Sequence, residues 1–281
     1  MTSRLLVNLF LLLSIAVVGF FIVNNPDDTE STIVRLGGPA TDSITDITIQ
    51  RNGLADIHLE KNNGNWWMTN PYKVRANDVP INSLLSLGQA ISHSRFPSEN
   101  KNLRDYDLQP AKASIAFNGT EYLFGNIEHI NKRRYILNDN TVHLTTDLFY
   151  HRLRTNTEAF ISPELIPANS EITSITLPDL EISKSAQGEW LLSGEHSGDK
   201  ISNDAIQILL DHWQNKQAVQ VLPAKISGDE KTIQLVFADN STIDFLLSRS
   251  KDNFTLIRQD LGLQYQLPVS AANDLLTLKQ L

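Results

Sequence analysis

The 281-residue chain carries 24 basic and 32 acidic side chains and no cysteine. Its net charge of −8 argues against binding to nucleic acid or to an anionic lipid surface. The absence of cysteine excludes disulfides, thiolate catalysis and zinc–thiolate sites, whereas 41% hydrophobic and 20% charged residues are typical of a folded globular protein.

An uncharged apolar run, Leu5–Val23, lies near the start of the chain. As a helix it would be about 28 Å long, close to the ~30 Å hydrocarbon core of a bilayer. A cleaved signal peptide is the alternative, but its apolar core is usually only about 7–15 residues long. The run also ends at bulky residues, Phe20–Val23, where a signal peptidase needs small ones. We therefore expect an uncleaved anchor that holds the chain in the lipid bilayer.

The charges that flank this run predict its orientation. Arg4 precedes it, and the first basic residue after it is Arg35. Because positive charge favours the cytoplasmic side, the N-terminus is expected in the cytoplasm and the body in the periplasm of a bacterial cell. The predicted location is the inner membrane, with residues 1–26 as cytoplasmic tip and transmembrane anchor and residues 27–43 as a linker.

The remainder of the chain is predicted to contain two tandem copies of one unit, because similar segments recur in the same order. The matched segments are Ile44–Ile49 with Ile172–Leu177, Gly64–Thr69 with Gly188–Ser193, Ile81–Leu85 with Ile206–Leu210, Ile115–Phe117 with Leu235–Phe237, and Tyr135 with Phe254. The expected boundaries are residues 44–155 for the first repeat domain, 156–170 for the connection and 171–281 for the second repeat domain.

Hydrophobic periodicity predicts the elements of each copy. The expected strands of the first copy cover residues 44–49, 55–61, 66–69, 114–117, 121–124, 134–137 and 142–145. Asp78 is expected to cap a helix with its apolar face at Ile81, Leu84, Leu85, Gly88 and Ile91, and a short helix is expected over 146–153. In the second copy, Ser202 is expected to cap the corresponding helix. The predicted fold class is α+β, with a mainly antiparallel β unit and one packed helix in each copy.

Two tryptophans occupy corresponding positions in the matched segments, Trp66 and Trp190. We expect both to pack a helix onto its sheet rather than to form a platform for a ligand.

The first copy resembles an uncharacterised bacterial domain family over about residues 44–150. The positions that carry the resemblance are Gly64–Trp66, Pro71, Ala76–Asp78, Leu84–Leu85, Tyr106–Pro110, Phe124–Gly125, Arg134–Tyr135 and Val142–Leu144. This family occurs in single-pass, membrane-anchored extracytoplasmic proteins, some of them auxiliary to ABC transport systems, including those tied to gliding motility. The resemblance implies a location and an accessory role, but no established activity.

No catalytic or metal-binding motif is recognisable in the sequence. None of the seven histidines forms a ligand pair at the spacings i, i+3 or i, i+4. Asp105 and Asp107 could form a carboxylate pair, but in a loop they are expected to be solvated or to cap a turn. The chain is therefore predicted not to be an enzyme and to need no cofactor or metal.

A basic group of residues is the main candidate for partner docking: Lys132, Arg133, Arg152 and Arg154. On an acidic protein, such a group could dock an anionic partner. The alternative is a solvated hairpin edge, on which charge prevents pairing with another strand.

Two functions follow from these expectations. The first is a non-catalytic, membrane-anchored extracytoplasmic accessory or scaffold protein, auxiliary to an ABC transporter or an envelope-assembly complex and bound to a membrane-protein partner. The alternative is a periplasmic ligand-binding or sensor protein that uses the cleft between the two repeats.

Overall fold

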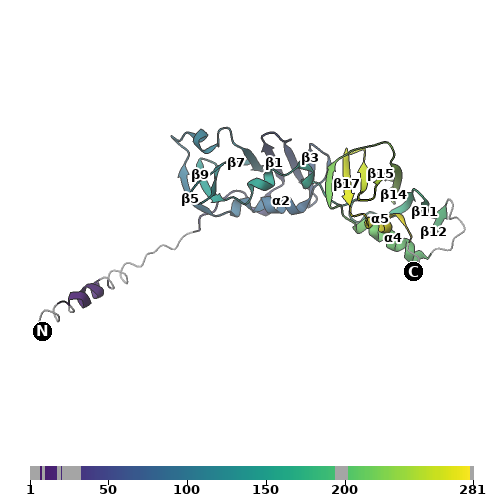
Figure 1. Ribbon diagram of the computed structural model, residues 1–281, viewed down its shortest axis with the longest axis horizontal. Coiled ribbons are helices and arrows are strands. Elements are labelled where there is room, and N and C mark those ends of the chain that lie inside the picture. Colours follow the sequence, from purple (N-terminus) through teal and green to yellow (C-terminus); the bar gives the residue numbers. More distant parts are fainter. Residues whose placement is uncertain (1–6, 8–9, 18–19, 21–32, 194–201, 279–281) are drawn as a thin grey trace.

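The computed structural model describes residues 7, 10–17, 20, 33–193 and 202–278. Two antiparallel sheets lie end to end along the long axis of the body (Figure 1). The first sheet has nine strands in the order β4-β3-β2-β1-β6-β7-β8-β9-β5. Their bounds are β1 (Asp46–Arg51), β2 (Ile57–Asn62), β3 (Asn65–Asn70), β4 (Val74–Arg75), β5 (Ser92–Pro97), β6 (Ala113–Phe117), β7 (Thr120–Ile127), β8 (Arg133–Asn138) and β9 (Thr141–Thr146).

The second sheet has eight strands in the order β12-β11-β10-β14-β15-β16-β17-β13. Their bounds are β10 (Ile172–Leu177), β11 (Leu180–Lys184), β12 (Trp190–Ser193), β13 (Gln220–Pro223), β14 (Lys231–Phe237), β15 (Thr242–Arg249), β16 (Phe254–Arg258) and β17 (Leu263–Leu267). Apart from the additional edge strand β4, the two sheets have the same strand order. The prediction of a mostly antiparallel β fold with few helices is therefore confirmed.

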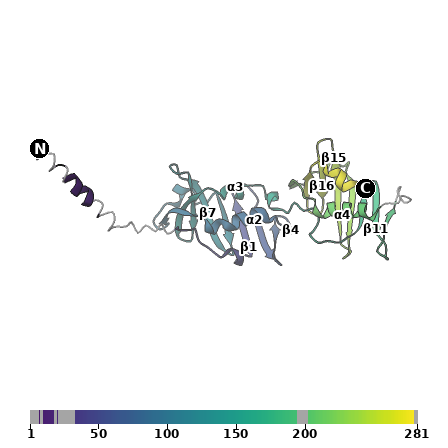
Figure 2. The same ribbon diagram turned by 90° about the horizontal axis from the view of Figure 1, so that it is seen from below.

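Within residues 33–193 and 202–278, the helices are short and few. They are α2 (Asp78–Leu85), α3 (Tyr150–Leu153), α4 (Asn203–Asn215) and α5 (Ala271–Leu276), with 3-10 turns η1 (Thr41–Ser43), η2 (Ser86–Gln89), η3 (Leu103–Tyr106) and η4 (Thr157–Phe160). In the chain, α2 precedes the outermost strand β5 of its sheet and α4 precedes the outermost strand β13. Viewed from two directions, α2 and α4 lie along the same side of the body (Figures 1 and 2).

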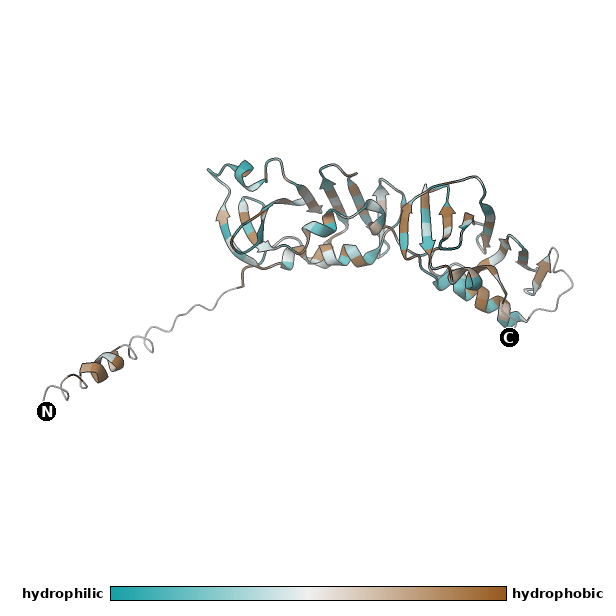
Figure 3. Cartoon of the chain, viewed as in Figure 1, coloured by the Kyte–Doolittle hydropathy of each residue, from teal (hydrophilic) through white to brown (hydrophobic). Residues whose placement is uncertain are grey.

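Alternation of apolar and polar residues explains the strands. In β1, Ile47 and Ile49 are fully buried, whereas Asp46 before them and Thr48 between them are half-buried. Directly opposite residues of an antiparallel pair share one face, and Ile47 pairs with Leu59 of β2. The same alternation is visible along the strands of both sheets (Figure 3).

The helix predicted over residues 78–91 is shorter than expected. It ends at Leu85 and continues only as the turn η2, and its N-cap is Asn77, whose side chain accepts from Val79 N at 3.1 Å. Gly88 packs against the backbone of residue 37, where a Cβ would lie 3.0 Å from the carbonyl oxygen. Ile91 is 46% exposed and does not belong to the buried face. This close contact lies beyond the end of the helix, in the turn η2.

Ser202 caps α4 as the sequence predicts. Its hydroxyl accepts from Asp204 N at 3.2 Å and so satisfies one of the free amide groups of the first turn. The other short helix, expected over residues 146–153, is reduced to the single turn α3.

Part of the segment predicted as a linker packs against the first sheet. Leu36 is 4% exposed, and its N–H donates to Ala90 O at 2.9 Å. Tyr122 donates its hydroxyl to Gly37 O at 2.7 Å. Residues 34–38 therefore belong structurally to the first unit.

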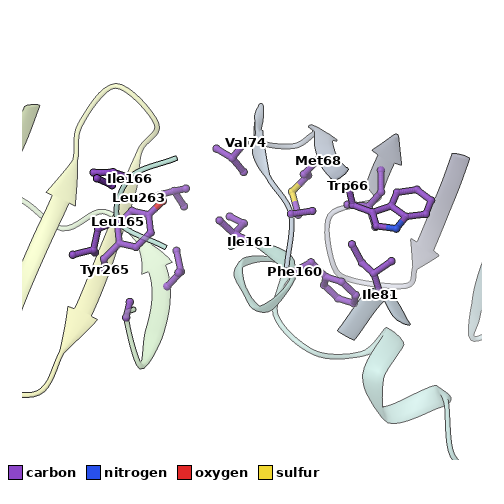
Figure 4. Packing of buried hydrophobic residues seen from close by; sticks show 14 of the residues in the cluster. Trp66, Met68, Val74, Ile81, Phe160, Ile161, Leu165, Ile166, Leu263 and Tyr265 are labelled. Carbon is purple, nitrogen blue, oxygen red and sulfur yellow. The ribbon is translucent and has the colours of Figure 1, made fainter. Parts of the chain in front are cut away.

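One cluster of buried side chains runs through both sheets and the connection between them. Phe160 and Ile161 pack on the side of the first sheet, and Leu165 and Ile166 pack on the side of the second (Figure 4). The buried guanidinium of Arg51 reinforces this arrangement because it donates to the carbonyl oxygens of residues 153 and 155 and to a hydroxyl at residue 157. The connection is thus part of the folded core.

The predicted span Leu5–Val23 lies partly outside the described residues. Within it, residues 10–17 are helical and apolar (Figure 3). Among the described residues, no helix combines the length and the apolar character that crossing a membrane requires.

Candidate functional site

A row of four side chains crosses the outer face of the first sheet. Asp46 of β1 lies opposite Glu60 of β2, Glu60 lies opposite Trp67 of β3, and Trp67 lies opposite Arg75 of β4. We call Asp46, Glu60, Trp67 and Arg75 the outer row. Because directly opposite residues point to the same side of a sheet, the outer row presents acidic, aromatic and basic groups together. Trp67, at its centre, is 42% exposed.

A histidine joins the acidic end of the outer row. His58 lies two residues before Glu60 on β2, and its Nε2 is 2.5 Å from Asp46 Oδ2. Its Nδ1 lies 3.9 Å from Glu60 Oε1 and 3.2 Å from Thr69 Oγ1. We call Asp46, His58 and Glu60 the His58 cluster. Its side chains are 40%, 37% and 54% exposed, so all three are accessible from solvent.

The basic end of the outer row borders a cleft between the two sheets. This cleft has a volume of about 440 Å³. Trp67, Lys73 and Arg75 line it from the first sheet and the loop before β4, and Arg258 and Tyr265 line it from the second. The connecting residues 162 and 164–169 form its floor. The use of such a cleft for ligand binding stays a prediction.

The two arginines of the cleft are neutralised by neighbouring carboxylates. Arg75 Nη2 lies 2.8 Å from Asp78 Oδ2, and Arg258 Nη2 lies 2.7 Å from Asp260 Oδ2. The hydrogen bond from Arg258 holds the pKa of the Asp260 carboxyl below its usual value. Lys73 is exposed, and the structure places no ion pair on it within the described ranges. The cleft is thus polar with little excess charge.

Tyr265 contributes a hydroxyl to the cleft wall. The residue is 4% exposed, and burial raises the pKa of its phenol, so the hydroxyl stays protonated at neutral pH. No hydrogen bond joins this hydroxyl to another residue in the part of the chain that the structure describes. Together with the indole of Trp67 it offers the combination of aromatic surface and polar groups that small-molecule sites use.

A partly buried hydrogen bond joins the first sheet to the connection near this cleft. Tyr72, in the loop between β3 and β4, donates its hydroxyl to Glu158 Oε1 at 2.8 Å. Burial, followed by this hydrogen bond to Glu158, raises the pKa of Tyr72 to about 12. The bond ties the loop that carries Lys73 to η4.

The four residues of the predicted basic docking group do not meet at one point. Lys132 is exposed and Arg133 is half-buried, at the start of β8. Arg152 lies half-buried in α3, and Arg154 donates to Asn52 O at 2.6 Å, beside β1. Since β8 is three strands from β1, the two ends of the group lie about 14 Å apart at the usual strand spacing. Its role in docking stays a prediction.

Four of the positions that carry the family resemblance, Tyr106, Leu108, Tyr135 and Val142, belong to a second, small hydrophobic cluster. The Tyr106 ring lies 5.5 Å from that of Phe96 and 4.9 Å from that of Tyr135. Gly125 allows the backbone of Tyr106 to approach, because a Cβ at Gly125 would lie 2.2 Å from Tyr106 O. Arg134 binds Asp147 with both ends of its guanidinium, at 2.7 Å each. These positions serve packing.

One serine–histidine pair resembles a nucleophile with its base. Ser92 Oγ lies 2.9 Å from His143 Nδ1. The two residues are 8% and 5% exposed, however, and burial, followed by the positive charge of Arg95, lowers the pKa of His143. A substrate could not reach this pair, and we interpret it as packing.

The His58 cluster escaped recognition in the sequence because its members are not at helical ligand spacings. His58 and Glu60 are two residues apart, which places them on one face of a strand. Asp46 reaches them only through the pairing of β1 with β2. The sequence did contain a signal for this cluster. Apolar and polar residues alternate on both sides of Asn52-Gly53, and pairing the two strands so that their apolar residues face each other places Asp46 opposite Glu60.

Comparison with the curated proteins and with the solved structures gave no match. Residues 66–281 match a protein family described as a domain of unknown function, DUF4340. The match begins in β3 and runs through the second sheet, so it covers more of the second unit than the resemblance seen in the sequence. The chain belongs to this family of unknown function.

Proposed function

We propose that this protein is a non-catalytic accessory or scaffold protein, held by its N-terminal run at the periplasmic side of a bacterial inner membrane. The observation that carries the proposal is the single core cluster that passes through both sheets and the connection. A body with one continuous core can hold a partner at a fixed distance and orientation from a membrane anchor. The resemblance to anchored, transporter-associated proteins supports a membrane-protein partner such as an ABC transporter or an envelope-assembly complex. We further infer that the two units are tandem copies, since their strand orders correspond.

Charge reversal tests the predicted docking group. Replacing Lys132, Arg133, Arg152 and Arg154 by glutamate is expected to release a partner that crosslinks to the wild-type chain in native membranes. Because exposed charges are screened beyond about 8 Å at physiological ionic strength, added salt should weaken the same crosslinks.

The matched control reverses Lys225, Lys231, Arg249 and Lys251 of the second unit to glutamate, which changes the net charge equally. A C-terminal alkaline phosphatase fusion reports whether the body is exported. An unchanged set of crosslinked proteins after reversal of the docking group would refute that group, and an inactive phosphatase fusion would refute the periplasmic location.

The cleft supports a second candidate function, binding of a small polar ligand such as a glycan. Trp67 offers an exposed indole face, and Tyr265 offers a protonated hydroxyl across the cleft. Sugars and related compounds combine an apolar face with hydroxyl groups, which suits this pairing. The little excess charge of the cleft also favours a neutral ligand.

A substitution at Trp67 separates this candidate from a purely structural cleft. Trp67→Ala is expected to abolish a saturable thermal stabilisation by periplasmic glycan fragments, because the indole supplies most of the apolar contact area. The exposed position makes the change in stability small, about 0.5 kcal/mol. Leu191→Ala, at an exposed position of the second sheet, is the control. Equal stabilisation of Trp67→Ala and wild type by every fragment would contradict the assignment.

A further inference from the structure

The His58 cluster has the composition and spacing of a metal site. We propose that Asp46, His58 and Glu60 bind a divalent transition-metal ion, with Zn²⁺ as the best match. Each residue offers one ligand atom, and these atoms lie within 4.8 Å of one another. One imidazole nitrogen and two carboxylate oxygens form a ligand set that Zn²⁺ accepts, and three protein ligands leave a coordination position for water or for a group of a partner.

Sheet geometry holds the ligands in place before the ion arrives. Asp46 and Glu60 are directly opposite in the pairing of β1 with β2, and His58 lies on the same face two residues from Glu60. Directly opposite like charges destabilise a sheet pair. A bound cation reverses this repulsion, so the placement of two carboxylates here favours a positive charge between them.

Thr69 gives the imidazole a defined orientation. Its Oγ1 lies 3.2 Å from His58 Nδ1 and 3.5 Å from His58 O. Without an ion, Nε2–H donates to Asp46 Oδ2 at 2.5 Å. An ion would take the place of that proton and move the two atoms apart. If the Thr69 hydroxyl donates to the carbonyl oxygen, it can accept the proton on Nδ1 while Nε2 binds the ion. Fixing one ring nitrogen by a hydrogen bond so that the other binds metal is the usual outer-shell arrangement of histidine ligands.

The second sheet shows that the fold does not require these carboxylates. Both sheets contain a lysine whose amino group lies over a tryptophan ring, and this shared contact aligns them. Lys61 Nζ lies 5.7 Å from the centre of the Trp66 ring, and Lys184 Nζ lies 5.9 Å from the centre of the Trp190 ring. In that alignment, Ser183 corresponds to Glu60.

The remaining positions follow from the strand pairing. Ser174 lies opposite Ser183, as Asp46 lies opposite Glu60, and Glu181 corresponds to His58. In the second unit, the two directly opposite positions that correspond to Asp46 and Glu60 are therefore both serines. The acidic pair and its histidine are an addition specific to the first unit, on the accessible face that continues to Trp67 and the cleft.

Zinc titration of the full chain tests the site. The chain is purified in detergent, freed of metal with a chelator and titrated with Zn²⁺ in a calorimeter. The wild type is expected to bind one ion at a site that His58→Asn removes. The double variant Asp46→Ser, Glu60→Ser installs the serines of the second sheet, so it is expected to fold and to lose the same site. Thr69→Val keeps the three ligands and is expected to weaken binding about tenfold.

The control is His93→Asn. His93 is an exposed histidine whose Nε2 lies 3.1 Å from a threonine hydroxyl, and its replacement is expected to leave zinc binding unchanged. Circular dichroism of each variant establishes that it is folded. Absence of saturable zinc binding in the wild type would overturn the proposal. So would wild-type affinity in the folded double-serine variant.

Discussion

Replacing Trp213 by alanine is expected to lower the free energy of unfolding by about 3–5 kcal/mol, the usual cost of emptying a buried tryptophan site. Trp213 is fully buried on α4, its ring lies 5.7 Å from that of Phe245 of β15, and its Nε1 donates to Leu275 O at 3.0 Å. The substitution therefore opens a cavity between helix and sheet and leaves a buried carbonyl without its donor. Denaturant unfolding followed by circular dichroism measures the change.

Trp190→Ala is the matched control in the same unit. Trp190 lies on the edge strand β12 and is only half-buried, so its removal is expected to cost about 1 kcal/mol. The sequence predicted that Trp66 and Trp190 both pack a helix onto a sheet. Trp66, at 3% exposed, is deeply buried, whereas its counterpart is partly open to solvent. Equal losses for Trp213→Ala and Trp190→Ala would contradict the packing described for α4.

Replacing Arg134 by alanine is expected to cost about 3 kcal/mol, because it removes one partner of a buried ion pair. The guanidinium side chain is 5% exposed, binds Asp147 at both ends and lies 3.7 Å from the ring of Tyr150. It also donates to Gly125 O at 2.5 Å. Asp147 is 24% exposed, so water can compensate part of its charge, which places the cost at the lower end of the usual range.

The adjacent residue provides the control for this substitution. Arg133 precedes Arg134 on β8 but points to the other face and is half-buried. Arg133→Ala is expected to change the free energy of unfolding by no more than about 0.5 kcal/mol. If the two alanine variants unfold at the same denaturant concentration, the ion pair with Asp147 contributes nothing to stability.

Elements with a clear apolar pattern could be predicted from the sequence. Strands β1 and β2 alternate cleanly, and α4 carries both a cap and a continuous apolar face. Strand β5, in contrast, has a polar sequence in which only Ser92 is buried, so nothing in its pattern indicates a strand. It is held in the sheet by pairing with β9, a contact between segments distant in sequence.

The pairing register of β1 and β2 determines which polar side chains lie together on the first sheet. An Asn-Gly turn is typical of a two-residue hairpin, which would pair residue 51 with residue 54 and place apolar residues opposite polar ones. The structure instead pairs Ile49 with Ile57, so the connection is longer and the apolar faces match. This register brings Asp46, His58 and Glu60 together. The predicted docking group shows the opposite case. Lys132 and Arg154 are near each other in the sequence, but the fold places them apart.

The outermost strand of the second sheet has a consequence for self-association. In the part of the chain that the structure describes, β12 pairs with β11 alone, so one side of its backbone is unpaired. Its sequence, Trp190-Leu-Leu-Ser193, carries no charge or proline, the features by which sheets usually prevent growth through added strands, and Leu191 is 50% exposed. In the first sheet, the edge strand β5 carries both an arginine and a proline. At high concentration, aggregation should therefore begin at β12, and Leu191→Lys should suppress it.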